Sequence, residues 1–214
     1  FFVFIAYSSQ TIGVTSAEGA PGRSGFISAS YCVIVPFLAW LFTGEVPDRY
    51  NIIAAVLCVI GLFFVFYTEL VKSANISFSQ GDLYALLSGL LFAVHIVSLA
   101  KWGAGKDPIL ITILQFLTAA VLSLIVSLIF EKPTFQSVSG SSLFALGYLA
   151  IMCTAVALLF QTIGQRYTPA STVALILGTE AVFSILFAVL FAGEKLTWSS
   201  VAGFVLIFLA IIVS

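Results

Sequence analysis

Long apolar runs, each about as long as a membrane-spanning helix, alternate along the chain with short polar connections. A helix needs about 20 apolar residues to cross a bilayer, where its backbone must satisfy its own hydrogen bonds. Turn and helix-start residues, such as Pro47-Asp48 and Gly81-Asp82, separate the runs. The pattern predicts an all-α fold, a polytopic transmembrane helix bundle of about eight spans: residues 1–17, 24–43, 50–68, 83–102, 108–130, 142–164, 170–192 and 197–214.

Composition agrees with a location in the bilayer, because 61% of the residues are hydrophobic, only 8% are charged and the mean hydropathy is +1.20. A net charge of −1 provides no basic face for nucleic acid, so we expect no nucleic-acid partner. Cys32, Cys58 and Cys153 lack the spacing of a metal or disulfide site, and we interpret them as packing residues. We therefore expect neither a metal site nor a cofactor.

Aromatic and basic residues mark the expected span ends. Trp40, Trp102 and Trp198 each fall near such an end, as an aromatic belt requires. The loop charges tie at four on each face: Arg23, Lys72, Lys132 and Lys195 against Arg49, Lys101, Lys106 and Arg166. The closest cluster is Lys101 with Lys106, so we place that face and the C-terminus in the cytoplasm, with the protein in the cell (inner) membrane.

Two copies of one unit are visible in the sequence. Gln10-Thr11-Ile12-Gly13 recurs as Gln161-Thr162-Ile163-Gly164, and Leu41-Phe42-Thr43-Gly44-Glu45 recurs as Leu190-Phe191-Ala192-Gly193-Glu194. The second copy contains five spans, and an odd number of crossings requires the two copies to be inverted in the membrane. Inverted repeats are typical of secondary transporters.

The first copy is shorter than the second, and residue 1 is Phe inside an apolar stretch, which we interpret as a fragment lacking about two spans. The predicted domains are residues 1–68, the last three helices of a truncated first repeat; residues 69–80, an inter-repeat loop; and residues 81–214, a complete five-helix second repeat. The parent would have ten spans in a 5+5 arrangement.

Several motifs in order resemble the EamA family of the drug/metabolite transporter superfamily. In the second copy they are Gly81-Asp82-Leu83, Gln115 to Ala120, Thr154-Ala155, Glu180 and Gly193-Glu194, and in the first Ser24-Gly25-Phe26-Ile27, Pro36 and Gly44-Glu45. The resemblance implies a ten-helix carrier of two inverted repeats that moves small organic solutes, commonly metabolites or amino acids, across the plasma membrane. The chain departs from the family where a frequent Glu-Pro pair is replaced by Glu180-Ala181.

Glu180 is the leading candidate for the solute or proton pathway, because it is the one charged residue near the middle of a span. An intramembrane carboxylate is costly unless it faces a cavity, pairs or is protonated. The alternative is a structural hydrogen bond between helices. His95, the single histidine, is the second candidate, for a proton relay or solute contact. A neutral histidine bonded to a backbone carbonyl is the favoured alternative there.

Glutamines and aromatic residues complete the candidate pathway. Gln10, Gln115 and Gln161 each offer a donor and an acceptor to a polar solute, with interhelical hydrogen bonding as an equal alternative. Tyr31 and Trp102 are further candidates, with aromatic packing as the default interpretation. A mid-span proline, Pro36, is the hinge candidate. A stripe of small residues, Ala85, Gly89 and Ala93, predicts a close helix contact, although ordinary helix composition explains it equally well.

These features predict a non-enzymatic secondary transporter, a permease or exporter of small organic metabolites such as amino acids, that works by alternating access. Its partners would be the lipid bilayer, the solute, and protons or a counter-solute. An intramembrane serine-protease-like enzyme is an alternative, based on Gly22-Arg23-Ser24-Gly25 and His95, but no nucleophile and base pair is evident. A non-transport scaffold subunit is another alternative. A channel lacks the expected charge ring or filter motif.

Overall fold

The computed structural model describes residues 1–16, 21–44, 46–72, 79–130, 139–193 and 195–214. Glu45, Glu194, Lys132 and residues 73–78 of the predicted inter-repeat loop lie outside these ranges. Within them the fold is helical: α1 (Phe2–Ser16), α2 (Pro21–Ser28), α3 (Tyr31–Thr43), α4 (Arg49–Lys72), α5 (Gln80–Trp102), α6 (Pro108–Phe130), α7 (Gly140–Tyr148), the π-helical segment η1 (Leu149–Val156), α8 (Ala157–Gly164), α9 (Ala170–Leu177), α10 (Glu180–Ala192) and α11 (Trp198–Val213).

Each expected span corresponds to one helix or to consecutive helices on one axis. Within the described residues, six stretches are long and apolar enough to cross a membrane: Arg23–Thr43, Arg49–Tyr67, Gln80–Trp102, Pro108–Phe130, Gly140–Gly164 and Ala170–Phe191. The remaining two, α1 and α11, are shorter, with 15 and 16 residues. The protein is thus a multi-pass membrane protein with the predicted all-α bundle.

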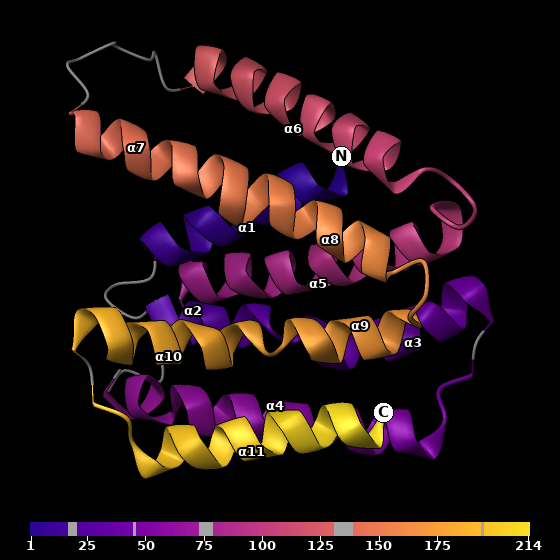
Figure 1. The fold of residues 1–214 in the computed structure, drawn as a ribbon, viewed down its shortest axis with the longest axis vertical. Helices are drawn as coiled ribbons and strands as arrows, with labels where there is room; N and C mark the ends of the chain where they lie inside the picture. The colour runs from indigo at the N-terminus through magenta and orange to yellow at the C-terminus, as the bar shows by residue number, and fades with distance from the viewer. Residues whose placement is uncertain (17–20, 45, 73–78, 131–138, 194) are drawn as a thin grey trace.

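The helices lie side by side, so that the connections collect at the two ends of the bundle (Figure 1). At one edge α4 packs along α11, and at the other α6 lies beside the α7–η1–α8 span. Between them α5 packs on α1, α2 and α3, and α3 also contacts α9. The two broken spans, α2–α3 and α9–α10, are therefore placed in the middle of the molecule.

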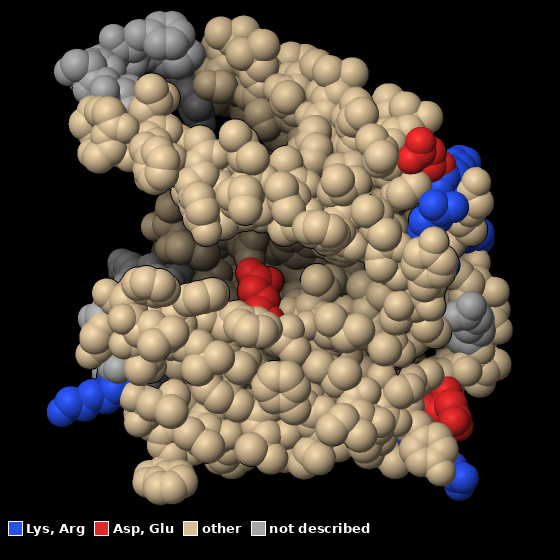
Figure 2. Space-filling model, viewed as in Figure 1, with Lys and Arg blue, Asp and Glu red and all other residues tan. Residues whose placement is uncertain are grey.

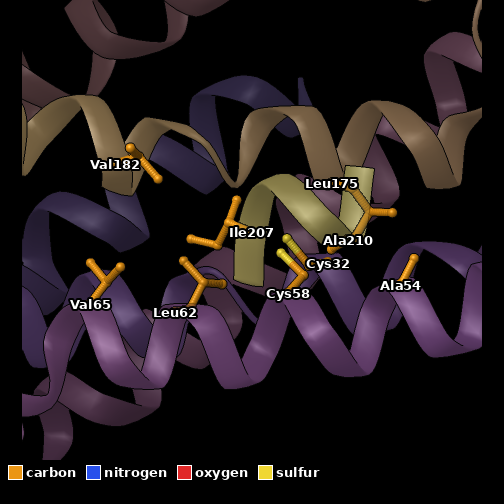
Figure 3. Packing of buried hydrophobic residues seen from close by; sticks show 9 residues of the cluster. All are labelled: Cys32, Ala54, Cys58, Leu62, Val65, Leu175, Val182, Ile207 and Ala210. Carbon is orange, nitrogen blue, oxygen red and sulfur yellow. The ribbon is translucent and has the colours of Figure 1, made fainter. Parts of the chain in front are cut away.

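Two glycines allow α4 and α11 to touch at their backbones. A Cβ added to Gly203 would lie 2.6 Å from the carbonyl oxygen of Gly61, and one added to Gly61 would lie 2.7 Å from Ile207. Val65 opposes Gly203 while Gly61 opposes Ile207, so the two helices run antiparallel. Figure 3 shows Leu62, Val65 and Ile207 converging on this seam. Such close approach favours van der Waals packing, which drives helix association in lipid.

The predicted stripe of small residues on α5 lies in a helix contact. Ala85 and Ala93 are fully buried, and a Cβ on Gly89 would lie 2.6 Å from the carbonyl oxygen of Ser28 in α2. On α1, a Cβ on Gly13 would lie 3.1 Å from the backbone nitrogen of Ala85. The stripe therefore allows α1 and α2 to pack closely on α5.

Both central spans are interrupted at matching positions. In the first, Ser30 N–H donates to Ile27 and Cys32 N–H to Ala29, which are three-residue bonds in place of the α-helical four-residue bonds. In the second, Thr179 N–H donates to Ile176 and Ala181 N–H to Gly178, each 149 residues further along. The same spacing separates Gly44 from Gly193, which end α3 and α10 with left-handed φ values of 79° and 70°. The internal repeat in the sequence is thus matched by a repeat in backbone geometry.

A buried ion pair joins the start of α2 to the start of α5. Arg23 Nη2 lies 2.6 Å from Asp82 Oδ2, and Asp82 is only 1% exposed. The same carboxylate accepts a hydrogen bond of 2.8 Å from the backbone N–H of Ser79, whose hydroxyl in turn accepts from Asp82 N–H. Asp82 therefore caps α5 and holds α2 against it.

We predict that Asp82→Asn lowers the free energy of unfolding by about 3 kcal/mol, because it leaves the Arg23 charge without its carboxylate in a largely buried site. The measurement is thermal unfolding of the purified protein in detergent. Asp107→Asn is the matched control, because Asp107 is exposed and its carboxylate accepts a local hydrogen bond from Ile109 N–H. Equal shifts of the unfolding midpoint in the two variants would contradict a special role for the ion pair.

Candidate functional site

A cavity of about 420 Å³ lies in the middle of the bundle, where the two broken spans face α1, α5 and α8. Figure 2 shows a hollow on one face of the molecule, with a single acidic side chain inside it and the other visible charges near the periphery. The lining residues are Val3, Tyr7, Gln10, Gly25, Ser28, Ala29, Tyr31, Leu62, Phe66, Phe92, His95, Ile96, Leu158, Gln161, Leu177, Gly178, Glu180, Ala181, Ser184 and Ile185. Five of the seven predicted pathway residues are among them.

Glu180 is the one charged side chain in the lining of this cavity. It is the first residue of α10, directly after the interruption at Gly178–Thr179. A carboxylate in the first turn of a helix interacts favourably with the partial positive charge of that helix end. Since the residue faces a cavity, a solute or a proton can reach its carboxylate without helix separation.

His95, Gln10 and Gln161 place unused hydrogen-bonding groups in the same cavity. His95 is 5% exposed, and its Nε2 atom has no hydrogen-bond partner within the described residues. In the described part of the chain, Nε2 therefore does not make the bond to a backbone carbonyl that the structural alternative proposes for a neutral histidine. The amides of Gln10 and Gln161, from α1 and α8, likewise make no side-chain hydrogen bond to any described residue. A polar solute could therefore satisfy all three groups.

Aromatic rings form one wall of the cavity. The ring of Phe92 lies edge-on to those of Tyr7 and Tyr31, with centroids 5.1 Å and 6.4 Å apart. Tyr31 also packs against both buried hydrophobic clusters of the bundle, so its position is fixed by the core. Tyr7 and Phe92 were not predicted, although Tyr7 precedes Gln10 by three residues and so shares its helix face.

Three further predicted residues lie elsewhere. Gln115 and Trp102 are absent from the lining of the central cavity. Both amide atoms of Gln115 are buried without a partner among the described residues, and Trp102 is 56% exposed beside Lys101 at the end of α5. Pro36 lies inside α3 and is buried, six residues after the interruption of that span at Ser30. The irregular backbone that could flex is thus at Ala29–Ser30.

A second cavity, of about 430 Å³, lies next to the first along the seam between α5 and α8. Ile96 and Gln161 line the central cavity, whereas Ala100 and Gln165, one helical turn further along each helix, line the second. Gln165 Nε2 donates a 3.0 Å hydrogen bond to the carbonyl oxygen of Ile96. This bond holds the two helices together between the cavities.

The residues of the serine-protease alternative are not assembled into a site. His95 lines the central cavity, but Ser24 does not, and the Ser24 hydroxyl is buried without a hydrogen-bond partner in the described part of the chain. A nucleophilic serine needs its base within hydrogen-bond reach. The arrangement gives no support to acyl-transfer chemistry.

Comparison with known proteins points to membrane transport. The model of the EamA-like transporter family matches residues 79–214. An uncharacterized transporter of Archaeoglobus fulgidus is 30% identical over 212 residues, which cover 98% of this chain and 65% of that protein. An uncharacterized transporter of Clostridium kluyveri is 25% identical over 137 residues, covering 63% of this chain and 44% of that protein. The chain thus spans between about half and two thirds of the length of these relatives.

A protein of known crystal structure shares the fold. It superposes with a TM-score of 0.79 at 18% sequence identity, over 99% of this chain and 71% of the other. At that identity the likeness concerns the arrangement of helices alone.

Proposed function

The chain belongs to the EamA-like transporter family, and from that premise we propose that the protein is a secondary transporter of small, amine-bearing organic solutes such as amino acids. The observation that carries the proposal is a central cavity whose single charged lining residue is Glu180. A carboxylate attracts an ammonium group, and the amides of Gln10 and Gln161 can bond the polar remainder of the solute. The aromatic wall of the cavity would contact an apolar side chain of the solute.

Alternating access is the mechanism that the repeat favours. We propose that residues 1–68 and 81–214 belong to two inverted repeats that rock about the central cavity. Equivalent helices α4 and α11 run antiparallel, and the interruptions of the two central spans match at a spacing of 149 residues. Irregular backbone at membrane depth is tolerated where it lines a cavity. The interruptions would let each half-helix tilt while the other half stays packed.

The Gln165–Ile96 hydrogen bond fits a closure on one side of the cavity. It joins α8 to α5 between the central and second cavities, so movement of these helices apart would connect the two. Protons or a counter-solute are the proposed coupling partners, with Glu180 and His95 as the groups that exchange them. We propose the cell (inner) membrane as the location.

Uptake into liposomes that contain the full-length protein tests the proposal. We expect saturable uptake of at least one amino acid or amine from a labelled panel, and a response of that flux to an imposed pH gradient if protons are coupled. Protein-free liposomes and liposomes with the Glu180→Gln variant are the controls. Absence of saturable flux across the panel from a folded, inserted protein would favour a scaffold role instead.

A further inference from the structure

The second cavity lies between two connections at one end of the bundle. The α5–α6 connection, from Gly103 to Lys106, forms one side, and the α8–α9 connection, from Gln165 to Pro169, forms the other. Trp102, at the end of α5, is 56% exposed, and Tyr167, within the α8–α9 connection, is 81% exposed. Exposed Trp and Tyr side chains at span ends are typical of the interface between hydrocarbon and water.

Two cationic side chains line this cavity from opposite sides. Lys106 comes from the α5–α6 connection and Arg166 from the α8–α9 connection. Within the described ranges, no carboxylate oxygen lies within 4.0 Å of the charged nitrogen atoms of either side chain. The neighbouring Asp107 is not part of the lining, and its carboxylate accepts a 2.9 Å hydrogen bond from Ile109 N–H at the start of α6. The cavity is therefore suited to an anion.

The start of α9 adds backbone donors. Pro169 occupies the N-cap position and provides no side-chain hydrogen bond to the first turn, and Ala170, the first helical residue, lines the cavity and is 3% exposed. The free N–H groups of a helix start carry a partial positive charge that favours phosphate or another anion. Pro169 and Ala170, at this helix start, line the same cavity as the two cations.

An independent observation comes from Gln165, which is 8% exposed and lines the cavity. Its Nε2 donates to the carbonyl oxygen of Ile96 at 3.0 Å, which fixes the orientation of the amide. The remaining atom, Oε1, is buried and has no partner among the described residues. An amide oxygen accepts hydrogen bonds, so a ligand that satisfies it must carry a donor as well as an anion.

We propose that this cavity binds the phosphate of a phospholipid headgroup that also carries a hydroxyl or amine, as phosphatidylglycerol does. The phosphate would contact Lys106, Arg166 and the start of α9, and the headgroup hydroxyl would donate to Gln165 Oε1. In this structure the Gln165–Ile96 hydrogen bond lies between this site and the solute cavity, and the proposal does not depend on transport.

Lipid retention by the purified full-length protein, followed by native mass spectrometry, tests the site. We expect Lys106→Gln with Arg166→Gln to weaken phosphatidylglycerol binding by about tenfold or more, because two charge-assisted contacts are lost. Arg49→Gln is the matched control, because Arg49 is exposed and stacks on Tyr50 but does not line the cavity. It should leave binding unchanged. Phosphatidylmethanol, which lacks the hydroxyl donor, should bind several times more weakly than phosphatidylglycerol.

Two results would overturn the proposal. One is unchanged binding in the double variant while its thermal unfolding is normal. The other is an equal loss in the Arg49→Gln control, which would indicate general attraction to surface charge.

Competition with glycerol 3-phosphate tests whether a soluble phosphate ester occupies the same cavity. We expect no displacement of bound lipid at equal concentration. Displacement would reassign the cavity from a lipid headgroup to a soluble phosphate ester. Because no step measures flux, these outcomes are independent of the proposed transport function.

Discussion

Glu180→Gln is expected to reduce solute flux by about tenfold to a hundredfold, the effect of losing one charge-assisted hydrogen bond. Glu180 is the single charged residue in the lining of the central cavity, so no other lining side chain can replace its charge. Glutamine retains nearly the same shape and can still accept a hydrogen bond. The amount of folded protein should therefore be unchanged.

Initial rates of uptake into liposomes, normalised to inserted protein, measure this effect. Asp48→Asn removes a carboxylate of the same chemistry from an exposed position outside the cavity and should transport normally. If the Glu180 variant retains normal flux with an unaltered response to pH gradients, the residue has no part in solute or proton movement. A similar loss in both variants would indicate an effect of overall charge.

Gly203→Val is expected to prevent stable packing of α4 on α11, with a loss of about 3 kcal/mol or more in the free energy of unfolding. The new Cβ would overlap the carbonyl oxygen of Gly61 at 2.6 Å and the side chain of Val65 at 2.7 Å. A backbone carbonyl cannot rotate away as a flexible side chain can. The two helices would have to separate along a seam that also holds Leu62 and Ile207.

Gly147→Val is the matched control, because a Cβ at Gly147 on α7 meets nothing within 4 Å. Size-exclusion profiles and thermal unfolding in detergent should show aggregation or a large downward shift for Gly203→Val and little change for Gly147→Val. Gly203→Ala should fall between the native protein and the valine variant. A stable, monodisperse Gly203→Val protein would show that the seam can relax.

Hydropathy was sufficient to predict the spans, because the bilayer imposes a length and an apolar composition on each one. The interruptions inside them were not predicted, because Ser30 and Thr179 are residues that helices tolerate and only Gly178 gives a local signal. The π-helical segment Leu149–Val156 likewise has an ordinary apolar sequence. Such features depend on packing against other helices, which no local pattern contains.

The two residues that were predicted from their cost in lipid line the central cavity, whereas some residues predicted on other grounds do not. Glu180 and His95 were conspicuous because ionisable groups are rare within spans, and both line the cavity. Gln115 carries the same amide as Gln10, yet α6 contributes nothing to the lining of the central cavity. Which face of a helix meets the cavity is set by tertiary packing. Tyr7 was missed because an aromatic residue is unremarkable in so apolar a chain.

The matched interruptions bear on the direction of flow. They share the same three-residue hydrogen bonds, and Figure 1 shows the α2–α3 and α9–α10 spans running in opposite directions. In the proposed inverted repeat, each half of the protein would therefore have an equivalent hinge. For a carrier built in this way, opening inward and opening outward deform equivalent joints and require comparable work. Import and export would then be one transport cycle running in opposite directions. The electrochemical gradients that the cell maintains would determine the direction.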